Sequence, residues 1–287
     1  MKKDPVMKML EIMELHQTAR ILNESAETCL GFGMIPTCED ALAVGTSKVG
    51  GNPDLPSSVP WPTWNGKALD FLLQINLAEI PQNLRNELLP ESGRFYFLYD
   101  RKSNTWGFDP QDRGSWKVLF VDGTEDELVR TGKPGAPGRA SSPACRVEFY
   151  EALPPDWTSV RDHPELKNHP EEVRKFDTLV ESLPRIPVHQ IMGNPHGIQS
   201  TPEEMRRQCQ LVSHGLYMGG GDGPPFDKAK AKELEPGAKD WRLLLQLDSD
   251  SDPGMEWGDR GRLYFWIREQ DLKEKNFEDV WMILECF

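Results

Sequence analysis

The sequence predicts an α+β fold: two duplicated, mainly antiparallel sheet units with flanking helices and long Pro/Gly-rich loops. Three observations predict it. Short apolar and aromatic runs of strand length recur along the chain. Four blocks of sequence occur twice in the same order. The 24 glycines and 24 prolines among 287 residues indicate long connections between short strands.

The N-terminal segment, residues 1–44, is predicted to be helical. Apolar residues follow spacings of three and four from Ile12 to Cys29, which aligns one face of a single helix over residues 4–30. We expect this helix to dock on the protein's own sheet, and pairing with a partner is the alternative. A second helix with one apolar side is predicted over residues 164–184.

Strands are predicted where apolar, aromatic and β-branched residues gather. The run FLLQIN at 71–76 has too many apolar residues for a half-exposed strand, so we expect it in the middle of a sheet covered on both faces. Residues 94–100 and 116–122 are aromatic and β-branched, which favours strands. The segment 131–144, rich in Pro, Gly and Ser, indicates a loop or boundary.

An internal duplication is predicted from four pairs of blocks. GGNPDLP and MGNPHGI begin 142 residues apart, FLLQIN and LLLQLD 172, GRFYF and GRLYF 168, and WKVLFV and WMILEC 165. The first separation is the shortest, which places an insertion in the second copy within residues 199–240. The pseudo-repeats cover about 45–130 and 186–287, joined by a loop and a helix. Chance similarity of aromatic strands is the alternative.

These blocks carry a resemblance to a known family. GGNPDLP, FLLQINLAEIP, HQIMGNPHGIQ and the segment from Leu243 to Phe287 resemble the YwqG-like family of bacterial proteins, a domain family of unknown function. The resemblance covers roughly residues 45–287, whereas residues 130–162 match nothing in the family pattern. It implies an α+β fold and a cytosolic protein of no established activity. Members of such families are discussed as immunity or partner-binding proteins in bacterial conflict systems.

The charge balance excludes several function classes. There are 46 acidic residues against 33 Lys and Arg, a net charge of −13, and the pI is near 5.0. Nucleic acid is therefore not expected as a partner, because its recognition needs clustered cations. No apolar run approaches the roughly 20 residues of a membrane span, and acidic residues interrupt the N-terminus where a signal peptide would be apolar. We expect a cytoplasmic protein without membrane contact.

The strongest chemical signal is the acidic segment DSDSDPGMEWGD. Carboxylates on alternate residues of a turn can converge on a divalent cation such as Ca²⁺, which makes Asp248, Asp250, Asp252 and Asp259 candidate metal ligands. The sixth position is Pro253 where an EF-hand has Gly, and the twelfth is Asp where it has Glu. The alternative is a solvated acidic turn that discourages edge aggregation.

The GGNP and MGNP loops are the second candidate site. Glycine lets backbone N–H groups point together and bind anions, although neither loop matches a phosphate-binding motif. The alternative is a turn that lets the chain cross the sheet closely. A ligand groove between the two units would be lined by Asn52, Asp54, Asn194 and His196.

No local sequence identifies a catalytic residue. The chain has neither a G-x-S-x-G nor an H-E-x-x-H sequence, and its five cysteines form no C-x-x-C pair. We therefore expect a non-enzymatic cytosolic binding protein, a monomer without an obligatory cofactor. Its partner would be another protein, of basic character, bound through the groove or an acidic face. The competing hypothesis is a metal-dependent hydrolase that uses the four aspartates.

Overall fold

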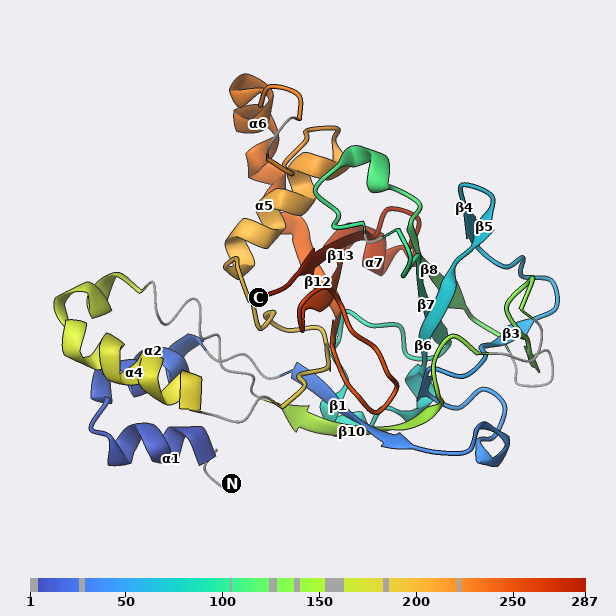
Figure 1. The fold of residues 1–287 in the computed structure, drawn as a ribbon, viewed down its shortest axis with the longest axis horizontal. Helices are drawn as coiled ribbons and strands as arrows, with labels where there is room; N and C mark the ends of the chain where they lie inside the picture. The colour runs from blue at the N-terminus through green and yellow to red at the C-terminus, as the bar shows by residue number, and fades with distance from the viewer. Residues whose placement is uncertain are drawn as a thin grey trace.

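The computed structural model describes residues 5–25, 29–103, 105–123, 128–136, 140–152, 163–182, 186–220 and 223–287. Its main feature is a ten-stranded antiparallel sheet that curls into a nearly closed barrel (Figure 1). In spatial order the strands are β14 (Trp281–Glu285), β13 (Arg262–Arg268), β12 (Trp241–Asp248), β11 (Gln190–Ile191), β1 (Cys29–Pro36), β10 (Cys145–Ala152), β2 (Lys48–Val49), β6 (Asp70–Asn76), β7 (Arg94–Tyr99) and β8 (Trp116–Val121).

Smaller elements surround this sheet. Two short antiparallel pairs join β3 (Asp54–Pro56) with β9 (Leu128–Arg130) and β4 (Thr63–Trp64) with β5 (Lys67–Ala68). The described α-helices are α1 (Pro5–Ile12), α2 (His16–Ser25), α4 (Pro170–Ser182), α5 (Pro202–Ser213), α6 (Lys228–Leu234) and α7 (Glu269–Lys273). No helix in this part of the chain is long and apolar enough to cross a bilayer.

The predicted strands and their burial are confirmed. All seven residues of β6 are buried, as are all six of β7, so both faces of the sheet are covered here. One face contributes to the main core, and the other packs a second cluster with the half-buried Trp61 and Trp64 against it. The apolar runs are therefore central strands, as their composition predicts.

The two predicted sheet units belong to one sheet. Strands β1 and β10 lie between them and pair over eight residues, from Cys29 with Ala152 to Pro36 with Cys145. The expectation of one helix over residues 4–30 was wrong. The helix breaks at Glu14, whose φ is 58°, and from Cys29 the chain is extended. The pairing partner of β1 is more than 100 residues away, and local spacing of apolar residues carries no information about it.

Helices α1, α2 and α4 form a separate small core to one side of the sheet (Figure 1). Its buried residues are Leu10, Leu15, Ile21, Leu22, Leu166, Phe176 and Leu179. The first helices therefore dock on the predicted second helix, which lies in the middle of the sequence, rather than on the sheet. The boundary at residue 44 stays a prediction, since β1 precedes it yet belongs to the large sheet.

Side chains and a loop join the two end strands, β8 and β14. The rings of Trp116 and Trp281 meet edge-on with centroids 4.9 Å apart. The carbonyl of Trp106 accepts a hydrogen bond from the backbone of β14 at 3.0 Å. Gly107 has a φ of 80°, and a β carbon there would lie 1.8 Å from the Met282 carbonyl oxygen. Only glycine fits this contact.

The runs β2-β6-β7-β8 and β11-β12-β13-β14 share their strand order and several details. Each has an irregularity of register in its first long strand, between Phe71 and Leu73 and between Leu243 and Leu245. In the first run, Gln74 accepts a hydrogen bond from the N–H of Asp54 and donates to the carbonyl of Thr46, and Tyr96 donates to the carbonyl of Asp54. In the second run, Gln246 accepts from the N–H of His196 and donates to the carbonyl of Val188, and Tyr264 donates to the carbonyl of His196. The six distances are 2.6–2.9 Å.

Candidate functional site

Each residue predicted to line a groove makes contacts on the side of its own run of strands. These residues are Asn52, Asp54, Asn194 and His196. The Asn52 Nδ2 donates to the Glu39 carboxylate at 3.0 Å, and the Asn194 Oδ1 accepts from Arg206 at 2.9 Å. The N–H of His196 donates to the buried glutamine of its run. These contacts favour the interpretation of the two loops as turns packed closely on the sheet, and a shared groove stays a prediction.

Asp54 lies at the centre of a buried charge cluster. Its Oδ1 accepts a hydrogen bond from Arg130 Nε at 2.9 Å, and the Lys48 Nζ lies 3.1 Å from its Oδ2. Burial by itself raises the pKa of Asp54, but Arg130, the Gly45 N–H and Lys48 together hold it below its ordinary value. Burial lowers the pKa of Lys48, and Asp54 offsets this only in part. The carboxylate thus neutralises two cations inside the protein.

The four aspartates predicted to bind a cation do not converge. Asp248 is fully buried and pairs with Arg262 Nε at 2.9 Å. The Asp250 Oδ2 lies 3.1 Å from His189 Nε2, and its Oδ1 accepts from the N–H of Asp252 at 2.9 Å. Asp259 is exposed beside Arg260. Among the described residues, no group of three or more His, Cys, Asp or Glu side chains is arranged to hold a metal ion.

His189 has a structural role that its neighbours in the sequence do not predict. Its Nδ1 accepts a hydrogen bond from the Asp248 N–H at 3.2 Å, so its Nε2 is left to donate to Asp250. This hydrogen bond outweighs burial and lowers the pKa of Asp250. The ring also stacks on Phe32 of β1, with centroids 5.3 Å apart. The acidic turn is therefore tied to the strands on either side of β11.

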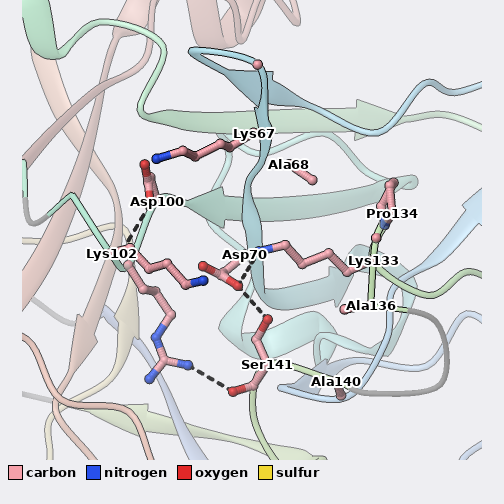
Figure 2. A pocket seen from close by; sticks show the side chains of 13 residues that line it. Lys67, Ala68, Asp70, Asp100, Lys102, Lys133, Pro134, Ala136, Ala140 and Ser141 are labelled. Carbon is pink, nitrogen blue, oxygen red and sulfur yellow. Dashed lines mark hydrogen bonds and ion pairs between the residues drawn. The ribbon is translucent and has the colours of Figure 1, made fainter.

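A pocket of about 810 Å³ lies in the first run of strands, and its Arg101 donates a hydrogen bond to the Gly254 carbonyl of the acidic turn. Its walls come from the turn between β4 and β5, the start of β6, the turn after β7, and residues 133–136 with 140–141. Figure 2 shows Lys67, Lys102 and Lys133 pointing toward the carboxylates of Asp70 and Asp100. Four of its lining side chains are basic and two are acidic.

The two acidic side chains of the pocket are engaged by the walls. The Asp70 Oδ1 accepts hydrogen bonds from Lys133 Nζ and Ser141 Oγ, both at 2.6 Å. Asp100 accepts from the N–H of Lys102 at 3.1 Å and from a neighbouring serine hydroxyl. Burial by itself raises the pKa of Asp100, but these hydrogen bonds and the charge of Lys67 bring it below its ordinary value.

The other three cations form no ion pair within the described residues, although the charge of Lys67 lowers the pKa of Asp100. Within the described residues, neither a hydrogen bond nor an ion pair engages the ammonium group of Lys67 or Lys102. Arg101 donates only to neutral oxygens: the Ser142 hydroxyl at 2.8 Å and the carbonyls of Ser141 and Gly254 at 3.2 and 3.1 Å. Burial accordingly lowers the pKa of Arg101, and the charge of Asp70 offsets this only in part.

A second pocket, of about 470 Å³, occupies the corresponding place in the other run. It is lined by Asp240, Arg268, Glu269, Gln270, Lys273 and Glu274. Glu269 and Gln270 lie 168 residues after Arg101 and Lys102, the same separation as the repeated GRFYF and GRLYF blocks. Here Glu269 pairs with both Arg242 and Lys273. Of these two pockets, as far as the structure describes their residues, the first has several cations outside ion pairs, whereas in the second Glu269 neutralises part of the positive charge.

Neighbouring residues in the sequence do not indicate this pocket. Lys67, Arg101, Lys102 and Lys133 come from three segments, and none of these is a basic run. The available signal was indirect: in a chain with more acidic than basic residues, a basic side chain ordinarily finds an acidic partner.

Comparison with known families finds one match, a domain of unknown function, DUF1963, over residues 47–286. Its limits lie close to those of the resemblance noted above, 45–287. No curated protein matches the chain.

Proposed function

Because the chain belongs to the DUF1963 family of unknown function, we propose a function from the pocket itself: the protein is a binding protein that holds an anionic group of its ligand at Lys67, Arg101 and Lys102. Lys133 neutralises Asp70, and Asp100 offsets only part of the charge of the other three cations, so a net positive charge is left to a ligand. That the family is the YwqG-like one remains part of this proposal.

The observation that carries the proposal is that three cations, none of them in an ion pair within the described residues, line one pocket in a protein of net charge −13. A cation that loses contact with water without gaining a counter-ion costs free energy. Arg101 is half-buried and bears that cost, and its position is fixed by three hydrogen bonds and by the Trp257 ring, 5.5 Å from its Cζ. Such fixed charge is characteristic of a binding site for an anion.

The partner expected from net charge alone was a basic protein. The pocket favours a ligand of the opposite sign, because an ammonium group of the ligand would meet three cations there. An anionic group borne by a protein is compatible with both the pocket and the expectation of a protein partner. A basic partner would have to bind elsewhere on the acidic surface.

The competing hypothesis, a metal-dependent hydrolase, rested on the four aspartates of the acidic turn. Asp248 is used by Arg262 and Asp250 by His189. The remaining two, Asp252 and Asp259, do not complete a cluster within the described residues. The contacts thus favour a structural use of this turn.

Calorimetric titration with small probes tests the binding proposal. Benzoate, phenyl sulfate and phenyl phosphate provide anions, and benzylamine provides a cation of similar size. We expect at least one anion to bind and benzylamine not to bind. The variant Lys67→Gln/Lys102→Gln should weaken anion binding about 10-fold or more, since a charge-assisted hydrogen bond contributes about 1.5–3 kcal/mol. Lys273→Gln, in the second pocket, is the matched control and should change nothing. Equal binding of the cation, or anion binding unaffected by the double variant, would contradict the proposal.

We also propose that the two runs of strands arose by duplication. Their shared strand order, register irregularities and glutamine contacts support this. If the glutamines are equivalent, Gln74→Met and Gln246→Met should each lower the free energy of unfolding by about 2–4 kcal/mol, because each leaves two backbone groups without partners. Chemical denaturation measures both. A large loss for one variant and none for the other would argue against equivalent roles.

A further inference from the structure

We propose that the anionic group held in the first pocket is a phosphate monoester in its dianionic form. The inference rests on the proposed function, since it names the chemical class of ligand for the same site. It concerns the lining side chains Lys67, Asp70, Asp100, Arg101, Lys102 and Lys133.

The charge of the pocket favours a dianion. Among the described residues, four basic and two acidic side chains line it, which gives a formal charge of +2. A phosphate monoester carries about −1.5 to −2 near pH 7. A single carboxylate or a sulfate monoester carries only −1 and would leave one positive charge uncompensated. Charge matching therefore favours a dianion such as a phosphate monoester over a carboxylate or a sulfate monoester.

The two carboxylates do not oppose a phosphate as strongly as their number suggests. Asp70 is neutralised by Lys133 at 2.6 Å and also accepts from Ser141. Asp100 accepts from the backbone of the turn that carries Lys102. Both carboxylates thus hold the walls in place, and because Asp100 offsets one of the other three cations, a net charge of +2 is left to a ligand.

The kinds of cation also suit a phosphate. Arg101 supplies a planar guanidinium, which can form two parallel hydrogen bonds to phosphate oxygens. Its Nη atoms already contact wall oxygens, while no hydrogen bond within the described residues uses its Nε. Lys67 and Lys102 approach from two different walls and act as mobile point charges.

The second pocket lies at the corresponding position of the other run but lacks the charges of Arg101 and Lys102. Glu269 and Gln270 stand where the first run has Arg101 and Lys102, and Glu269 is neutralised by Arg242 and Lys273. The fold therefore does not require cations at these positions. Their presence in one run only is consistent with selection for a ligand.

The volume of about 810 Å³ exceeds what inorganic phosphate occupies, so the pocket has room for the organic part of an ester. Two sources share this chemistry: a small organic phosphate and a phosphorylated side chain of a protein. The probes chosen below distinguish them.

The test is a calorimetric titration of the full chain with phenyl phosphate, phenyl sulfate and benzoate at several pH values between 5 and 8. The second pKa of a phosphate monoester is about 6, so phenyl phosphate should bind about 10-fold or more tightly at pH 8 than at pH 5. The two monoanions should bind more weakly and with little change. No histidine lines the pocket among the described residues, and its ionisable side chains there are Asp, Lys and Arg. The change of charge between pH 5 and pH 8 is therefore that of the ligand.

Two variants make the result specific. Arg101→Lys keeps the charge but removes the planar fork, and it should weaken phenyl phosphate about 10-fold. Lys67→Gln should weaken it as well, and this exposed substitution avoids the risk that a change at Arg101 disturbs folding. A phosphoserine peptide and its unphosphorylated form complete the set. Tighter binding of the phosphopeptide than of phenyl phosphate assigns the site to phosphorylated proteins, and the reverse assigns it to small esters.

The outcomes separate the two proposals. If phenyl sulfate and benzoate bind as tightly as phenyl phosphate and the affinity does not change with pH, the phosphate inference is overturned while the anionic-ligand proposal stands. If no anion binds to the first pocket, both are overturned.

Discussion

The substitution Asp248→Asn distinguishes a structural carboxylate from a metal ligand. Asp248 is fully buried, and its carboxylate accepts hydrogen bonds from Arg262 Nε at 2.9 Å, from the N–H of Val188 at 3.0 Å and from the N–H of Ser249 at 2.9 Å. Asparagine is close in size but neutral, so it leaves Arg262 buried without its counter-ion. Breaking a buried pair in this way costs about 3–5 kcal/mol.

Chemical denaturation followed by tryptophan fluorescence measures the effect. We expect the free energy of unfolding to fall by that amount both in EDTA and in millimolar Ca²⁺. Asp259→Asn is the matched control, because this exposed residue of the same turn should change stability by no more than about 0.5 kcal/mol. An Asp248→Asn protein as stable as the wild type would refute the reasoning. So would a loss that appears only when Ca²⁺ stabilises the wild type.

Three further predictions concern the barrel closure, the buried cluster and the cysteines. Gly107→Ala should lower the free energy of unfolding by about 1–3 kcal/mol more than Gly66→Ala, because both glycines have positive φ but only the first meets a backbone oxygen; equal losses in denaturation would contradict the closure described. Asp54→Asn should cost about 3–5 kcal/mol at neutral pH. Because the pKa of Asp54 is lowered on folding, the difference in free energy of unfolding between the variant and the wild type should stay constant above about pH 5 and shrink as pH falls through the folded-state pKa. A difference that does not change with pH would contradict this. Under native conditions at pH 8 a thiol reagent should label Cys38 first, because this cysteine is exposed. Cys145 should react slowly, because burial raises its pKa to about 11. Rapid labelling of Cys145 would be inconsistent with its burial.

Sequence reasoning succeeded where the structural cause is local. The apolar run of β6 indicated a central strand because both of its faces are buried. The single apolar side predicted over residues 164–184 belongs to the helix α4, in which Phe176 and Leu179 are buried. In both cases the residues that decide the structure are neighbours in the sequence.

It failed where the cause is distant. Cys29 and the residues after it form a strand because β10, more than 100 residues later, pairs with them. The spacing of Asp248, Asp250 and Asp252 predicts a cation site, which stays a prediction, but it could not indicate that His189 and Arg262 contact the carboxylates of Asp250 and Asp248. A spacing pattern shows which carboxylates are close together but not which cations the fold brings to them.

The pocket was missed for the same reason. Its basic side chains come from segments about 30 residues apart, and each is an ordinary surface residue by its neighbours. The acidic net charge predicts a basic partner, and this stays a prediction. The proposed anion site is a local exception to the net charge of the chain.

The most direct test of the account is a crystal structure of the protein soaked in arsenate, a phosphate analogue that anomalous scattering can locate. We predict an anomalous peak in the first pocket within hydrogen-bonding distance of Arg101 and of Lys67 or Lys102, with none in the second pocket beside Glu269. A pocket without a peak at saturating arsenate, or peaks of equal height in both pockets, would contradict the claim that the first pocket is built for an anion.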